Sequence, residues 1–235
     1  MSTDKRIEHA IKHTEILRAP KQSLYTFGTT NLYYYLVTEP VYSELIKDVS
    51  ETVVREGRVI AERPKIVTPY YLSRLEGFST EARRYFEALV EKHGERSVHG
   101  LFYTYKNEPK ELTIVSDNLL SVVDKLNAEI DKRSDPLAAI IKGEDELWDV
   151  SLMKFIHEVT RISVPDNLRQ LGRRGFLNTD TDGTPLDARV RIDELFEKVT
   201  KGEQEPDELK DELDRWGLFE EYEDRFLNLF RKKTG

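Results

Sequence analysis

The chain contains no cysteine, so disulfide bonds, cysteine nucleophiles, thiolate zinc sites and iron–sulfur clusters are excluded. No apolar run approaches the ~20 residues that a membrane-spanning helix needs. The N-terminal sequence also lacks the apolar stretch of a signal peptide. The glycines do not form the spaced motifs that bind nucleotide phosphates or surround a serine nucleophile. We therefore expect a soluble cytoplasmic protein with no membrane partner.

Acidic residues outnumber basic residues by 44 to 36, which gives a formal net charge of −8. Most of this excess lies between Asp193 and the C-terminus. Affinity for nucleic acid comes from lysine and arginine, so an acidic chain is a poor general binder of nucleic acid. A local basic patch remains compatible with contact to phosphate.

The first half of the chain has the alternating apolar pattern and the turn residues of β-structure. Strands are predicted at residues 24–27 and 32–37, joined by a four-residue turn at 28–31, and at residues 65–68. Two further hairpins are predicted, one at residues 52–62 with Glu56 and Gly57 as its loop and one at residues 98–115 with residues 106–109 as its loop. Helices are predicted at residues 4–18 and at residues 80–93, the second covering the sheet.

From residue 117 onward the apolar residues recur with helical spacing. Helices are predicted near residues 119–130, 137–141, 148–162 and 192–199, and as a final pair on either side of Gly217. The fold class is therefore α+β: an N-terminal antiparallel sheet of hairpins with its covering helix, and a C-terminal helical bundle packed on it. Residues 1–116 form the β-rich half and residues 117–235 the helical half. No flexible linker separates the halves, so we expect one compact unit.

Residues 178–183 resemble the start of an EF-hand calcium loop, with three oxygen-bearing side chains at alternate positions followed by glycine. The twelfth position, which should supply a bidentate glutamate, is Arg189. We therefore interpret this segment as a turn rich in Asn and Asp before a helix.

Two histidine patterns fall short of a metal site. His157 and Glu158 begin a zinc-protease pattern, but Arg161 stands where the second histidine should be. His9 and His13 are four residues apart on one helical face, and the sequence indicates no third ligand for them. We therefore predict no metal, no cofactor and a fold that does not depend on metal.

An arginine group that begins near the end of the long helix is a candidate anion-binding site. Its members are Arg161, Arg169, Arg173 and Arg174, with Arg189 and Arg191 beyond the following loop. Guanidinium groups bind phosphate and carboxylate through paired hydrogen bonds. The alternative, which we favour, is that these arginines pair with the acidic last helices of the same chain.

Tyrosines gather in the β-rich half. The candidate ligand or partner surface consists of Tyr25, Tyr33, Tyr35, Tyr70 and Tyr71. In a strand, Tyr33 and Tyr35 share one face, whereas Tyr34 takes the other. Tyrosine combines an apolar ring with a polar tip, so these residues suit either a core or a binding surface.

Without a recognisable catalytic motif, the sequence favours a binding or interaction module over an enzyme. Its contact surface would be the tyrosine-rich sheet, and its partner another protein or a second copy of this chain. One alternative is an enzyme that acts on an anionic or phosphorylated small molecule through the arginine group. Another is an RNA-associated factor that uses tyrosine stacking and the same arginines.

Overall fold

A computed structural model describes residues 3–44, 50–68, 71 and 100–231 of the chain. The chain divides into two compact units. Unit 1 consists of Met1–Pro64 and Tyr103–Asn167, and unit 2 consists of Lys65–Phe102 and Leu168–Gly235. The covering helix predicted at residues 80–93 lies outside the described residues.

Unit 1 is built on a five-stranded mixed sheet with the strand order β1-β7-β2-β3-β6. Strands β2, β3 and β6 pair antiparallel, β7 runs parallel to β2, and β1 is antiparallel to β7. The strand bounds are β1 (Glu15–Arg18), β2 (Thr30–Thr38), β3 (Thr52–Ala61), β6 (Tyr105–Val115) and β7 (Ala138–Lys142). The helices are α1 (Thr3–His13), the short 3-10 helix η1 (Val41–Glu44), α4 (Leu119–Arg133) and α5 (Trp148–Arg173), the last of which continues into unit 2.

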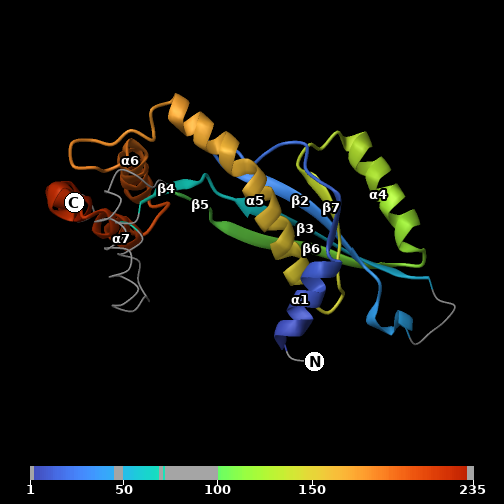
Figure 1. Ribbon diagram of the computed structural model, residues 1–235. Helices are drawn as coiled ribbons and strands as arrows, with labels where there is room; N and C mark the ends of the chain where they lie inside the picture. The colour runs from blue at the N-terminus through green and yellow to red at the C-terminus, as the bar shows by residue number, and fades with distance from the viewer. Residues whose placement is uncertain (1–2, 45–49, 69–70, 72–99, 232–235) are drawn as a thin grey trace. The chain divides into compact units, whose positions relative to one another are not determined.

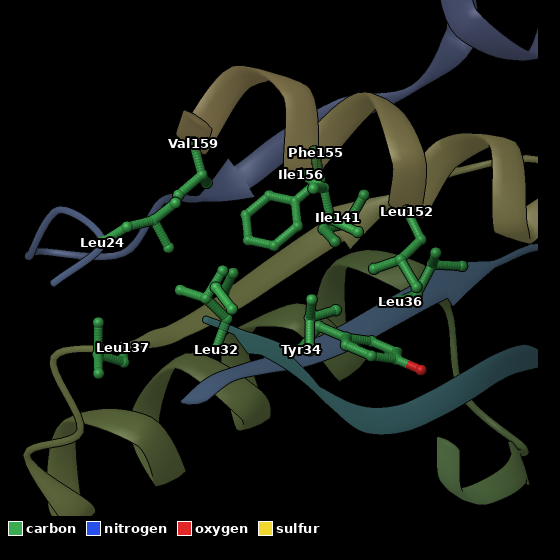
Figure 2. Packing of buried hydrophobic residues seen from close by; sticks show 13 residues of the cluster. Leu24, Leu32, Tyr34, Leu36, Leu137, Ile141, Leu152, Phe155, Ile156 and Val159 are labelled. Atoms are coloured by element: carbon green, nitrogen blue, oxygen red, sulfur yellow. The ribbon is translucent and has the colours of Figure 1, made fainter. Parts of the chain in front are cut away.

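Alternating side chains of β2 pack against different helices on the two faces of the sheet. Helix α5 crosses the sheet (Figure 1). Leu32, Tyr34 and Leu36 pack with the α5 residues Leu152 and Phe155 in one core (Figure 2). A second core joins the opposite face of β2 to α4 through Tyr35, Val37, Val122, Val123 and Leu126. The period of two in the strand thus gives unit 1 an apolar core on each side of its sheet.

Unit 2 contains the strand pair β4 (Lys65–Val67) and β5 (Gly100–Phe102), the end of α5, and three further helices. These are α6 (Leu186–Lys201), α7 (Pro206–Trp216) and α8 (Phe219–Arg231). Gly202 and Gly217 end α6 and α7 with positive φ angles of 74° and 68°, the left-handed conformation that glycine adopts without strain. Apolar residues of α6, α7 and α8 share one core, which confirms that the last two helices form a docked pair.

The apolar segment at 137–141, predicted as a helix, is strand β7 and lies between β1 and β2. Both faces of this strand are buried, so its sequence is a continuous apolar run with no alternation. Five buried apolar residues therefore fit a short helix and a central strand equally well, and only the long-range pairing with β2 decides between them.

The hairpins predicted at residues 52–62 and 98–115 were also wrong. Residues 52–61 form the single strand β3, and residues 105–115 form the single strand β6. Gly57 lies in mid-strand, where a Cβ atom would collide with the phenol of Tyr34 on the neighbouring strand. The glycine serves close packing rather than a turn.

Two boundaries near the N-terminus differ as well. The first helix ends at His13, and β1 begins at Glu15. Residues 24–27 form a loop instead of a strand. Among the described residues, no helix combines the length and the apolar character that crossing a membrane requires.

Candidate functional site

A cavity of about 550 Å³ opens on the α4 side of the sheet in unit 1. Its lining comes from the middle of β2, from β3 and β6, and from the end of α4 with the segment that follows it. The lining residues that bear on function are Tyr33, Tyr35, Glu56, Arg58, Glu108 and Arg133. We call this the tyrosine cavity.

Tyr33 and Tyr35 lie on this face of β2, as their spacing predicts, but their environments differ. The Tyr33 side chain is exposed at 42%, whereas Tyr35 is exposed at only 7%. A guanidinium nitrogen of Arg133 donates to the Tyr35 hydroxyl over 3.3 Å. Burial, reinforced by the nearby Glu56 carboxylate, raises the pKa of Tyr35. Tyr35 therefore forms a fixed part of the wall, while Tyr33 has a face available for contact.

Tyr34 points to the opposite face and belongs to the α5 core. Its hydroxyl donates to the Asn107 side-chain oxygen over 3.1 Å. Burial raises the pKa of Tyr34, and the hydrogen bond to Asn107 lowers it by less. Tyr34 is thus a core residue with a satisfied hydroxyl group.

Charged groups of both signs surround the cavity. Arg58 makes two contacts with the Glu108 carboxylate, from Nε over 2.7 Å and from Nη2 over 2.6 Å, and Lys106 Nζ lies 2.8 Å from the same carboxylate. Hydrogen bonds from Lys106 and Arg58 lower the pKa of Glu108. Arg133 pairs with Glu129. The cationic groups at this site therefore have acidic partners within the chain.

The other candidate tyrosines do not join this cavity. Tyr25 lies in the loop before β2 with an exposure of 43%, and its backbone N–H donates to Thr30 Oγ1 over 2.8 Å. Tyr70 lies outside the described residues. Tyr71 is buried in unit 2, where its hydroxyl donates to Glu212 over 3.0 Å. Burial and the neighbouring Glu212 carboxylate raise the pKa of Tyr71 to about 12.

Three of the four arginines predicted to bind an anion lie along α5, Arg174 directly follows the helix, and all four are exposed. Arg161 belongs to unit 1, whereas Arg169, Arg173 and Arg174 belong to unit 2. The four residues therefore do not form a cluster within one unit.

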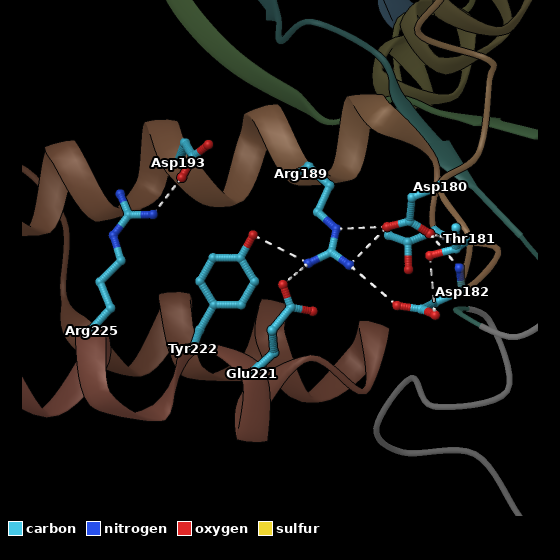
Figure 3. A network of polar contacts seen from close by, with 9 residues as sticks. Asp180, Thr181, Asp182, Arg189, Asp193, Glu221, Tyr222 and Arg225 are labelled. Carbon is cyan, nitrogen blue, oxygen red and sulfur yellow. Dashed lines mark hydrogen bonds and ion pairs between the residues drawn. The ribbon is translucent and has the colours of Figure 1, made fainter.

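Beyond the loop, Arg189 has a set of partners within unit 2 (Figure 3). Its guanidinium group contacts the Asp180 carboxylate at 2.8 and 2.9 Å and the Glu221 carboxylate of α8 at 2.6 Å. The central carbon of this guanidinium group, Cζ, lies 5.7 Å from the ring centre of Tyr222. Pairing with the acidic last helix is therefore observed for Arg189, and Arg191 pairs with Asp187 on its own helix.

The same contacts explain residues 178–183. Asp180 accepts hydrogen bonds from the backbone N–H groups of Asp182 and Thr184, over 3.0 and 2.9 Å. The residue at the twelfth position of the calcium pattern is the cation that neutralises Asp180. The segment is an Asp-centred turn closed by an arginine, in agreement with the interpretation from sequence.

Sequence reasoning missed Arg58 and Glu108, which lie directly opposite one another on β3 and β6. The error follows from the two hairpin predictions, which placed both residues at or next to a loop. Their opposite charges at paired positions of two adjacent strands are a usable signal once both segments are read as continuous strands.

Comparison with models of known protein families, with curated proteins and with solved structures found no match to this chain.

Proposed function

We propose that this protein is a protein-binding module and that the rim of the tyrosine cavity is its contact surface. The observation that carries the proposal is the half-exposed Tyr33 at a cavity of about 550 Å³ whose walls bear charges of both signs. Tyrosine and arginine are enriched among the residues that dominate binding energy at protein interfaces. The partner is a polypeptide segment that places one side chain in the cavity and contacts Tyr33 and Arg58 at its rim.

The charge balance supports a polypeptide over a small anion. The lining carries three basic side chains, Arg58, Lys110 and Arg133, and three acidic ones, Glu56, Glu108 and Asp135. A phosphate site requires an excess of donors, and here Arg58 and Arg133 are each paired with a glutamate. A peptide can offer both signs and exchange partners with these pairs. The anion-dependent enzyme and the RNA-associated factor have less support, because Arg189 and Arg191 of the arginine group are already paired with acidic residues of the chain.

The edge position and the sequence of strand β6 limit how the partner can bind. In the described part of the chain, β6 is the last strand of the sheet and supplies Glu108, Pro109 and Lys110 to the cavity lining. Proline cannot donate a hydrogen bond to an added strand, and the register shift opposite Glu56 and Gly57 disrupts the edge. We therefore expect the partner to bind through side chains at the cavity and not by adding a strand to this part of β6.

A displayed library of random peptides, selected on the full chain, tests the proposal. The decisive comparison is Tyr33→Ala with Tyr25→Ala, because the two tyrosines have nearly equal exposures of 42% and 43%. Loss of an interface anchor costs about 2 kcal/mol or more, so we expect selected peptides to bind Tyr33→Ala roughly 30-fold more weakly. The Tyr25→Ala variant should bind them within about twofold of the wild type.

Thermal unfolding of both variants controls for damage to the fold. Peptides that bind Tyr33→Ala and the wild type equally would overturn the assignment of this surface. Failure to select any saturable peptide binder would overturn the proposal that the module binds polypeptide segments.

A further inference from the structure

Two histidines and a glutamate meet at one side of unit 1, outside the tyrosine cavity. His9 and His13 lie one turn apart on α1, and their rings stack with centroids 3.8 Å apart. Glu144, in the connection between β7 and α5, brings its carboxylate to them. One ligating atom from each of the three residues lies within 4.8 Å of the other two. The third ligand that sequence spacing could not supply thus comes from a distant part of the chain.

The geometry of the donor atoms suits a single ion. His9 Nδ1 and Glu144 Oε1 are 3.6 Å apart. Two ligands at ~2.0–2.2 Å from a tetrahedral zinc ion are separated by about 3.4 Å, so this spacing is close to that of two ligands of one metal ion.

A backbone contact orients the second imidazole. His13 Nδ1 lies 2.8 Å from the carbonyl oxygen of His9. A carbonyl oxygen only accepts hydrogen bonds, so Nδ1 carries the hydrogen and Nε2 keeps a free lone pair. Metal-binding histidines are commonly held in this way, with one ring nitrogen donating to the backbone and the other free to ligate.

Contacts on both sides of the three residues hold α1 against the elements that carry Glu144. Arg6 pairs with Glu146 over 2.5 Å, one turn before His9. At the other end of α1, Lys154 Nζ donates to the Thr14 carbonyl oxygen over 2.8 Å, and Thr14 Oγ1 donates to Ser151 Oγ over 2.8 Å. The positions of the histidines relative to Glu144 therefore do not depend on a metal ion.

We propose that His9, His13 and Glu144 form a binding site for a divalent transition-metal ion of the zinc type. Imidazole ligands favour zinc, copper and nickel, whereas magnesium and calcium favour sites made of oxygen ligands. Three protein ligands leave at least one coordination position for water or for an outside ligand. The His9 and Glu144 side chains are exposed at 53% and 40%, so the ion exchanges with solution. Bound metal would fasten α1 to the β7–α5 connection without being required for folding.

Isothermal titration of the full chain, without a histidine tag, with zinc chloride at pH 7.5 tests the site. We expect one saturable equivalent of zinc. The His13→Ala and His9→Ala variants should each lose roughly 100-fold or more in affinity, because loss of an outer partner alone costs ~10–100-fold. Glu144→Gln, which keeps the size of the side chain and removes its charge, should also weaken binding. His157→Ala is the matched control, since His157 is an exposed helical histidine outside this group, and it should bind zinc like the wild type.

Hydrogen exchange gives a second readout. Zinc should slow exchange of the amides of α1 in the wild type and in His157→Ala, and should have no such effect in His13→Ala. Binding should also weaken at pH 5.5, because protons compete with the metal for imidazole. Zinc binding that is unchanged in the His9, His13 and Glu144 variants would overturn the site, as would calcium or magnesium binding as tightly as zinc.

Discussion

The two units place their charged residues differently. In unit 2, the carboxylates of Asp187 and Glu212 are buried, with side-chain exposures of 0% and 4%, and both are bonded to neighbouring side chains. In unit 1, the described sheet is covered by apolar cores, and charged groups such as Arg58 and Glu108 remain partly exposed at 43% and 30%. Unit 1 also holds a largely buried pair, Arg55 and Asp145, but the Arg58 and Glu108 side chains at its cavity remain accessible to a partner. We therefore expect function to reside first in unit 1.

Trp216→Ala should produce the largest effect and tests whether the aromatic residues of unit 2 are structural. Trp216 is 6% exposed, and its ring centre lies 4.8 Å from that of Tyr71. Truncating a buried tryptophan costs about 3–5 kcal/mol of unfolding free energy. Urea denaturation measures the loss, and Phe230→Ala, at 47% exposure, should lose much less. Equal and small losses in both variants would mean that this aromatic surface serves a partner instead of the core.

Asp187→Ala tests whether the buried ion pairs of unit 2 are structural. The Asp187 carboxylate lies 3.0 Å from Arg191 Nε, and the Arg191 side chain is only 14% exposed. Removing one partner of a buried pair leaves a charge without compensation, so we expect a loss of about 3 kcal/mol or more. Asp193→Ala is the control, because the Asp193–Arg225 pair is about half exposed and should contribute about 0–1 kcal/mol. Similar losses in the two variants would remove the contrast between buried and exposed charges.

The Asp180 carboxylate of unit 2 should make the folding stability depend on pH. Burial raises the pKa of Asp180, but the hydrogen bonds from Arg189 and from the N–H groups of Thr184 and Asp182 outweigh it, so the pKa is lowered overall. A lowered pKa means that the folded state favours the ionised carboxylate. Its contribution to stability is present above the ordinary aspartate pKa of about 3.9 and is lost as the pH falls through the lower folded value.

Urea denaturation of Asp180→Asn from pH 7 to pH 3 checks this expectation. The variant should be less stable than the wild type at pH 7, and the difference should shrink below pH 4. Asp182→Asn should show little difference at any pH, since Asp182 is 70% exposed and lies 4.0 Å from Arg189. A constant difference between Asp180→Asn and the wild type at every pH would contradict the assignment.

Replacing Arg173 and Arg174 together by alanine should have a small effect. Both side chains are exposed, and exposed ion pairs contribute only about 0–1 kcal/mol to stability. We also expect unchanged binding of phosphate compounds and RNA at ~150 mM salt, where weak surface attraction is screened. Phosphate or RNA binding by the wild type that disappears in a stable double variant would instead favour the enzyme or the RNA-associated factor.

The smallest expected effect is that of calcium on residues 178–187. Because Arg189 already neutralises Asp180, added calcium up to ~1 mM should leave amide exchange in this segment unchanged. Saturable protection by calcium would show that the ion displaces the arginine and that the loop is a binding site.

Local sequence signals sufficed where one element determines its own structure. The spacing of Val122, Val123 and Leu126 identified α4, and Gly217 correctly separated the last two helices. Alternation placed Tyr33 and Tyr35 on one face, but it did not show that one would be buried and the other exposed. That difference depends on α4, whose apolar side chains pack in one core with Tyr35 and whose Arg133 reaches the Tyr35 hydroxyl.

Local sequence signals failed where contacts with a distant segment of the chain determine the structure. Gly57 is a turn residue by local rules, and its actual role is to make room for Tyr34 of the neighbouring strand. Strand β7 has no local period because it is buried on both faces. Likewise, Glu144 could not be assigned to His9 and His13, because the chain between them includes all five strands of the unit 1 sheet.

The position of β7 between β1 and β2 has a consequence for how the protein emerges from the ribosome. Leu36 of β2 is paired with Ile141 of β7. Strand β2 therefore cannot form this pairing until roughly 100 further residues have been synthesised. At ~5–20 residues per second, that edge of β2 stays open for roughly 5–20 s during synthesis. A nascent chain that stops before Ala138 would carry an apolar strand with an unpaired edge, which is a natural target for chaperones and a starting point for aggregation.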